Sequence, residues 1–225
     1  MSARGRIGAL LACAVAVLLV AWYAGTQNAA PVPAPAAGAV RLGPDPGEDV
    51  AAYLARIPAD LPPDGVAALA LVQLPEQLSI GDAVAAVAGS SPVTAVLRAP
   101  IPRVQTALRF EALEERVGPV QALENAQARA RQRAEADAAR LTGRQRDVAA
   151  AEASLLADPA CRCVLALVVR ADRAGLAALA GRPEVRAVQA APPDVTAREL
   201  ALSPLLPEQV ERADPPVDDG GVTTR

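Results

Sequence analysis

The sequence predicts an α+β fold class: an N-terminal transmembrane helix, then a ferredoxin-like antiparallel sheet that carries a long Ala/Arg-rich helical insertion. Three observations support this prediction. Residues 7–24 contain no charged side chain. The rest of the chain contains four short apolar runs with the length of buried strands, arranged as two strand–helix–strand units. Between the units, residues 111–157 are rich in Ala, Arg, Glu and Gln, which favour helix.

Residues 7–24 are long enough to cross a membrane as one helix, which would span about 27 Å. Positive charge before the segment predicts that residues 1–6 are cytoplasmic. The rest of the chain then lies outside, in a single-pass plasma-membrane protein. Cleavage as a signal peptide and lipid attachment at Cys13 are the alternatives. The side chains that we expect at the membrane interface flank the segment: Arg4, Arg6, Trp22 and Tyr23.

A linker and a short helix precede the sheet. Residues 25–47 are rich in Pro and Ala, a composition typical of an extended spacer. We expect the extracytoplasmic α+β domain to comprise residues 48–195. A short amphipathic helix at its start is predicted by four apolar residues at helical spacing: Val50, Tyr53, Leu54 and Ile57. Residues 62–65, Pro-Pro-Asp-Gly, then favour a turn.

The first strand–helix–strand unit begins with the apolar run 66–74, which predicts a buried strand. Ser79 and Asp82 have the spacing of a capping box and predict the start of a helix. A second strand is expected at 93–97. Residues 104–110 resume an extended pattern after two prolines, so we expect an edge strand or a bent strand there.

Residues 111–157 predict a helical insertion, which Gly118 interrupts early and which Gly143 kinks or divides into a hairpin. Between Leu123 and Leu141 its apolar stripe consists of Ala alone. We therefore expect a solvated helix that lies on the domain, with a coiled-coil arm as the alternative.

The second unit begins with the apolar run 164–169, followed by a helix that Asp172 can cap and by a strand at 185–188. These strands are apolar on both sides, so both faces of the sheet need cover. The Ala-rich helices and a second subunit are the candidates for the second cover. The polar, Pro-rich residues 196–225 are expected to be mostly disordered.

The stretch from Val168 to Gln189, with Pro183-Glu184 before its last strand, resembles the second half of a subtilisin-propeptide-type protease inhibitor domain. The resemblance implies a ferredoxin-like fold, in agreement with the order of the predicted elements. It also implies inhibition or modulation of a subtilisin-type protease through the end of the domain. By this resemblance, the segment that contacts the protease comprises Gln189, Ala190, Ala191, Pro192 and Pro193.

The composition excludes most catalytic chemistry. All 22 basic residues are Arg and the chain contains no His, which is typical of a high-GC bacterial genome. Ser-His and Cys-His pairs, imidazole ligands, Schiff-base lysines and P-loop lysines are therefore excluded. We expect no cofactor and no metal. The net charge of -3 and the scarcity of aromatic residues argue against a nucleic-acid partner.

Paired carboxylates could still support glycoside hydrolysis. The candidate side chains lie in the Arg-rich insertion: Glu111, Glu114, Glu115, Glu124, Glu135 and Asp137. Ion pairs on a solvated helix face, such as Asp137 with Arg140, explain these residues better than catalysis does. We therefore predict that the chain is not an enzyme.

Cys161 and Cys163 form the most distinctive local feature of the sequence. In an extended chain, residues two apart point to the same side, so the two sulfurs are neighbours. Outside the cytoplasm we expect them to oxidise. An inert disulfide, an intermolecular bridge and a redox-active pair are the alternatives.

Together these observations favour a non-catalytic, membrane-anchored binding or scaffolding protein of the bacterial cell envelope. We expect two partners, the membrane through residues 7–24 and a protein of the envelope, and a homo-oligomer stays open. A protease inhibitor of the subtilisin-propeptide type and a thiol-redox accessory protein are the alternative functions.

Overall fold

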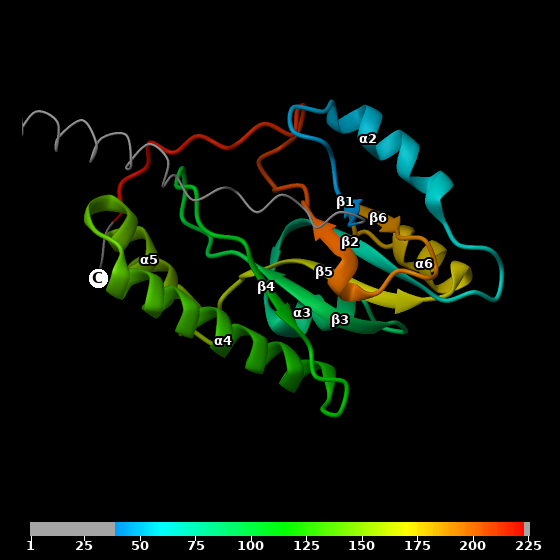
Figure 1. Cartoon of the computed structure of the whole chain (residues 1–225), viewed down its shortest axis with the longest axis horizontal. Helices are drawn as coiled ribbons and strands as arrows, with labels where there is room; N and C mark the ends of the chain where they lie inside the picture. The colour runs from blue at the N-terminus through cyan, green and yellow to red at the C-terminus, as the bar shows by residue number, and fades with distance from the viewer. Residues whose placement is uncertain (1–38, 223–225) are drawn as a thin grey trace, which may run out of the picture. The chain divides into compact units, whose positions relative to one another are not determined.

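A five-stranded sheet organises the part of the chain that the computed structural model describes, residues 39–222 (Figure 1). Its spatial order is β4-β3-β5-β2-β6, and every neighbouring pair of strands is antiparallel. The strands are β2 (Ala68–Leu78), β3 (Ser91–Leu97), β4 (Arg109–Ala112), β5 (Val164–Ala171) and β6 (Ala187–Ala190). The structure therefore has the mixed α+β character that the sequence predicts.

Two strand–helix–strand units build the sheet. In the first unit α3 (Ile80–Ala86) joins β2 to β3, and in the second unit α6 (Arg173–Ala180) joins β5 to β6. The central strands β2 and β5 pair from Ala68, opposite Ala171, onward. The order β3-β5-β2-β6 is consistent with a ferredoxin-like arrangement, to which β4 adds an edge strand beside β3.

Local sequence signals start both of these helices. The Ser79 hydroxyl accepts a hydrogen bond from the Asp82 amide, and the Asp172 carboxylate accepts one from the Gly175 amide. These bonds satisfy amides that the first helical turn leaves free. The edge strand expected at residues 104–110 is present only in part, because the strand that pairs with β3 alone, β4, begins at Arg109.

The helical insertion is a hairpin of α4 (Pro119–Arg140) and α5 (Gly143–Leu156). Gly143 has a φ of 55° at the junction, a conformation that favours glycine, so this residue divides the insertion. The predicted Ala stripe is buried in the core of the domain: Ala122, Ala126, Ala130 and Ala134. Small side chains let the helix backbone approach closely, and the expected helix lying on the domain is confirmed.

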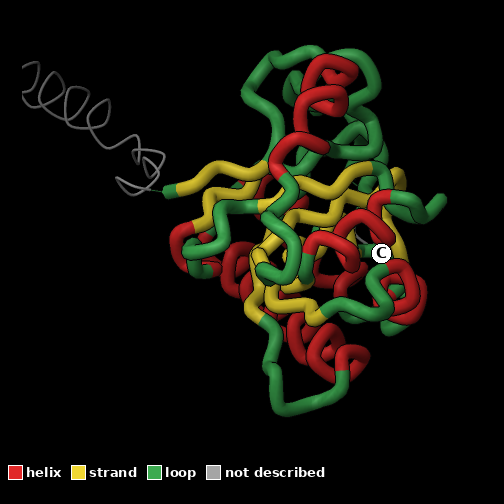
Figure 2. Tube along the Cα trace, turned by 90° about the vertical axis from the view of Figure 1, so that its right-hand side faces the viewer, coloured by secondary structure: helices red, strands yellow, loops and turns green. Residues whose placement is uncertain are grey.

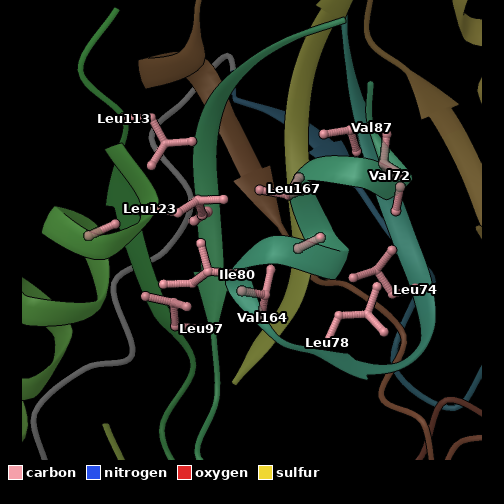
Figure 3. Packing of buried hydrophobic residues seen from close by; sticks show 14 of the residues in the cluster. Val72, Leu74, Leu78, Ile80, Val87, Leu97, Leu113, Leu123, Val164 and Leu167 are labelled. Carbon is pink, nitrogen blue, oxygen red and sulfur yellow. The ribbon is translucent and has the colours of Figure 1, made fainter. Parts of the chain in front are cut away.

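One face of the sheet packs against α3, α4 and α6 in the main hydrophobic core. Figure 3 shows Ile80 of α3 in this cluster with Leu97 of β3, Leu123 of α4 and Val164 of β5. None of these four side chains is more than 7% exposed. Burying one such side chain stabilises the fold by about 1.5–3 kcal/mol, so this layer fixes the sheet on its helices.

Segments from both ends of the described chain cover the second face of the sheet. β1 (Val40–Leu42) pairs in parallel with β7 (Leu200–Leu202), and Leu42 is buried in one cluster with Leu69 and Leu71 of β2. Figure 2 shows the strands running between helical segments. The Ala-rich helices lie against the other face and therefore do not supply this second cover.

A short helix precedes the sheet, as the spacing of apolar residues predicts. α2 (Val50–Arg56) continues into the 3-10 turn η1 (Ile57–Asp60), and the Asp49 carboxylate accepts a hydrogen bond from the Ala52 amide at its start. Its buried side chains form a third cluster together with Leu205. The helix thus joins the two ends of the described chain to one another.

The predicted fold class needs correction in its membrane part. Within residues 39–222, no helix is both long enough and apolar enough to cross a membrane. The longest helix within these residues, α4, is rich in Arg, Gln and Glu, so the described part of the chain has a mixed α+β fold. The expected span 7–24 lies outside the described residues, as do the expected interface residues Arg4, Arg6, Trp22 and Tyr23.

Two boundaries of the expected domain also need correction. The expected linker 25–47 contributes β1, and the expected disordered tail 196–225 contributes the 3-10 turn η2 (Ala197–Glu199), β7 and the fully buried Leu205. Apolar residues in these polar, Pro-rich segments find partners only in the folded domain. The composition of these two segments predicts disorder, but contacts with residues that are distant in the sequence order parts of both.

Candidate functional site

Residues 98–105, the first part of the connection between β3 and β4, form a loop that a distant part of the chain covers. Its first residue, Arg98, is buried and ion-pairs with Glu208 at 2.7 Å. The Arg98 carbonyl accepts a hydrogen bond from Gln77 Nε2 at 2.6 Å, and Thr106 Oγ1 bonds to the Ala99 carbonyl at 2.8 Å. These contacts hold the loop on the end of the sheet.

Residues 208–220, which we call the closing segment, run along this loop toward the junction of α4 and α5 (Figure 1, red). Arg103 binds the Asp219 carboxylate through both Nε, at 2.6 Å, and Nη2. The Gln105 amide donates to Asp218 Oδ1 at 3.1 Å, and Arg144 Nη2 donates to the same oxygen at 2.9 Å. Neighbouring carboxylates are therefore held by two separate arginines.

Backbone contacts complete the attachment of the closing segment. The Gly220 amide donates to the Arg103 carbonyl at 2.7 Å, and Arg144 Nη1 donates to the Gly220 carbonyl at 2.9 Å. Gln105 Nε2 donates to the Pro216 carbonyl at 2.5 Å. A Cβ atom at Gly220 would lie 2.8 Å from the Arg103 carbonyl oxygen and closer still to that of Pro102. A residue larger than glycine does not fit this position.

A cavity of about 550 Å³ lies between the loop and the closing segment. Apolar side chains line both of its walls together with as many polar and charged side chains, among them the Arg98–Glu208 ion pair. We call this cavity the groove. Its apolar lining comprises Pro100, Ile101, Pro102, Val104, Pro215, Pro216 and Val217.

Hydrogen bonds stabilise the ionised form of three carboxylates around the groove, those of Glu208, Asp218 and Asp219. The hydrogen bond from the Gln105 amide lowers the pKa of Asp218, and the bonds from Arg103 lower the pKa of Asp219. Burial alone would raise the pKa of Glu208, but the hydrogen bond from Arg98 helps to make the net shift downward. A lowered pKa keeps these carboxylates ionised near neutral pH, where they accept hydrogen bonds.

Most of the candidate carboxylates of the insertion form ion pairs with arginines. The expected pair of Asp137 with Arg140 is confirmed, at 2.6 Å. Most of the other candidates are neutralised by arginines as well: Glu111 by Arg129 and Arg133, Glu114 by Arg129, Glu135 by Arg131, and Asp137 also by Arg109. Within residues 39–222, no group of acidic or thiol side chains is arranged to hold a metal ion.

A second polar cluster is buried and structural. Gln73 Nε2 donates to Tyr53 Oη at 2.6 Å, and Tyr53 donates in turn to Gln189 Oε1 at 2.9 Å. The amides of Gly43 and Leu205 complete the cluster, each donating at 2.7 Å to one of the two glutamines. Burial raises the pKa of Tyr53 to about 12. The cluster joins both ends of the described chain to β2 and β6.

The structure joins Cys161 and Cys163, just before β5, in a disulfide whose Cα atoms are 5.3 Å apart. Both residues are buried in the main core, where a reductant or a partner thiol has little access. An inert disulfide fits this environment best among the three alternatives. Redox activity of the pair stays a prediction.

The segment expected to contact a protease is largely inaccessible. Gln189 and Ala190 belong to β6, and both are buried, as is Ala191. Within the expected segment only Pro192 and Pro193 are exposed. Three of the five residues that the resemblance assigns to the protease contact are therefore buried in the domain.

The residues that hold the closing segment were not predicted from the sequence. Arg103 and Asp219 are 116 residues apart, and Arg144 is one of many arginines in the chain. The adjacent carboxylates of Asp218 and Asp219, followed by two glycines, are the signal that could have indicated a recognition element. Comparison of the chain with protein-family models, with curated proteins and with solved structures gives no match.

Proposed function

We propose that this chain is a non-catalytic binding protein and that the groove receives a peptide segment of a protein partner. The observation that carries the proposal is the apolar lining of the groove on both walls, with charged groups that are already paired at its border. Binding pockets commonly combine apolar walls with a few placed polar groups.

The surrounding chemistry supports binding over catalysis. Arg98 and Glu208 are held by one another, and Asp218 and Asp219 accept hydrogen bonds that lower their pKa values. Proton transfer near neutral pH needs a group with a pKa close to the working pH. The groove offers shape and apolar contact instead, which suit recognition of an extended peptide.

Selection of linear peptides from a random display library, with the purified full chain as target, tests this proposal. We expect selected peptides to lose about tenfold or more in affinity with the Ile101→Asp variant, because a carboxylate in an apolar wall must be desolvated on binding. Ile101 is only partly buried in a loop, so the variant should retain its circular dichroism spectrum.

Val66→Asp is the matched control, because Val66 is an exposed apolar residue outside the groove. Peptides that bind this variant and the unmodified chain equally, but bind Ile101→Asp weakly, would support the proposal. A selection that yields no peptide dependent on Ile101 would contradict it.

A further inference from the structure

The closing segment occupies the loop in the manner of a bound peptide. From Pro216 to Gly220 it is held by three side chains, those of Arg103, Gln105 and Arg144, and by backbone bonds to the loop. Its own side chains contribute little burial, since Val217 is 59% exposed. The attachment therefore depends on polar recognition and hardly at all on a shared core.

Each of three consecutive positions is recognised in a different way. Asp218 accepts from the Gln105 amide and from Arg144, and Asp219 accepts the two-pronged contact of Arg103. Two parallel bonds from one guanidinium match the geometry of a carboxylate closely. Gly220 is selected by sterics, because a Cβ atom would meet the carbonyls of the loop. The three positions together specify the sequence Asp-Asp-Gly.

The backbone of the loop has an unusual conformation at Arg103. Arg103 adopts a φ of 58°, a left-handed conformation that residues other than glycine rarely adopt. From this position its guanidinium reaches Asp219 while its carbonyl accepts from the Gly220 amide. Unusual backbone conformations of this kind cluster at ligand-binding positions.

We propose that Arg103, Gln105 and Arg144 form a recognition site for an Asp-Asp-Gly sequence in an acidic peptide of the partner protein, and that residues 218–220 occupy this site in cis as a competitor. This inference rests on the proposed binding function and names the chemistry of the partner. The inference is supported by the complementary charges of the site and of residues 218–220, since this segment of the chain is itself an example of a peptide that the site binds.

The cis segment regulates the site by mass action. A tethered peptide acts at an effective concentration on the order of millimolar, so a partner peptide must compete with it. The ion pairs are solvent-exposed and individually weak, which keeps the segment displaceable. A partner that offers the same acidic motif, preceded by apolar residues that take the places of Pro215, Pro216 and Val217 beside the loop, would displace it.

Fluorescence anisotropy with a labelled synthetic peptide, Pro-Val-Asp-Asp-Gly-Gly, tests the inference on the full chain. Gly220→Ala introduces the Cβ atom that the loop cannot accommodate and so releases the cis segment. We expect this variant to bind the peptide about tenfold more tightly than the unmodified chain. Gly221→Ala is the matched control: a Cβ atom there has no neighbour within 4 Å, and no change is expected.

The assignment of the arginines is tested in the Gly220→Ala background. Adding Arg103→Gln and Arg144→Gln should abolish binding of the peptide, whereas adding Arg146→Gln should not, because Arg146 pairs only with Asp147 among the described residues. A peptide with Asn-Asn in place of Asp-Asp should fail to bind the Gly220→Ala chain.

Failure of the inference can be distinguished from failure of the proposed function. Library peptides that depend on Ile101 but lack an acidic motif would overturn the inference and leave the binding function standing. Absence of both Ile101-dependent peptides and Asp-Asp-Gly binding would overturn both. A dimer of the unmodified chain that Gly220→Ala dissociates would assign the site to a second copy and overturn the partner assignment.

Discussion

Among the attachments of the chain after β6 to the domain, two have opposite physical character. At Leu205 the attachment is buried: the Leu205 amide donates to Gln73 inside a polar cluster that also satisfies Tyr53 and Gln189. At residues 216–220 it is exposed and ionic, with Arg103 and Asp219 each more than half exposed.

Buried, fully paired polar groups are costly to break and specify one arrangement, whereas exposed ion pairs are weak and sensitive to salt. The attachment at Leu205 is therefore part of what stabilises the fold. The attachment at residues 216–220 is weak enough for the segment to be displaced. Experiments that perturb one attachment and leave the other intact test whether the two differ in this way.

The largest effect is expected for Gln73→Leu. Leucine has a similar volume, but the Leu205 amide and the Tyr53 hydroxyl then lose a partner while they remain buried. We expect a loss of about 2–3 kcal/mol in the free energy of unfolding. Urea denaturation measures this loss, with Gln121→Leu as control, because Gln121 is exposed and bonds only to Asn125. Equal stability of both variants would show that the buried cluster does not hold the fold.

Alkaline pH probes the same cluster through Tyr53. Burial raises its pKa to about 12, above the ordinary value of 10.0, so the folded state retains a proton that the unfolded state loses. This stability is fully present below pH 10 and is lost as the pH rises through about 12. The expected loss is about 2–3 kcal/mol across this window. Unfolding midpoints at several pH values measure it, and Tyr53→Phe should show a flatter profile.

Much of the central sheet could be predicted because its signals are local. Ser79 and Asp172 start helices with their own neighbours, and the Ala stripe of residues 122–134 identifies a helix that packs closely. Apolar runs and helix caps each involve residues that are close to one another in the sequence. A single sequence therefore contains enough information to place these elements.

The covers of the sheet and the candidate site could not be predicted, because they depend on distant pairs. Leu42 becomes buried only when β1 meets β7, and the Tyr53 hydroxyl meets Gln189 across 136 residues. Polar and Pro-rich composition indicates disorder when such partners are unknown. Among 22 arginines, nothing local distinguishes Arg103 or Arg144 as the residues that bind the closing segment.

We expect salt to weaken the attachment at residues 216–220 and to leave the attachment at Leu205 unchanged. Raising NaCl from 0.05 M to 1 M shortens the screening length to about 3 Å, which weakens exposed ion pairs much more than buried hydrogen bonds. Hydrogen exchange measures both places: we expect protection of the Gly220 amide to fall about threefold to tenfold, and protection of the Leu205 amide to stay constant. Parallel loss of protection at both amides would mean that the segment is attached as one unit.

The smallest effect is expected in acid, at the carboxylates that the loop binds. The Arg103 contact lowers the pKa of Asp219 below the ordinary value, and the Gln105 amide does the same for Asp218. A group with a lowered folded-state pKa stabilises the attachment above its ordinary pKa. That stabilisation is lost as the pH falls through the lowered value.

Carbon-detected NMR titration of the carboxyl groups should therefore give midpoints below 3.8 for both residues, and Arg103→Gln should return Asp219, more than Asp218, toward its ordinary value. Unchanged titration of Asp219 in this variant would mean that Arg103 does not bind it in solution. The global unfolding midpoint should hardly move in the same variant, because the buried cluster at Leu205 retains its hydrogen bonds. A segment can thus leave its site while the fold that presents the site stays intact.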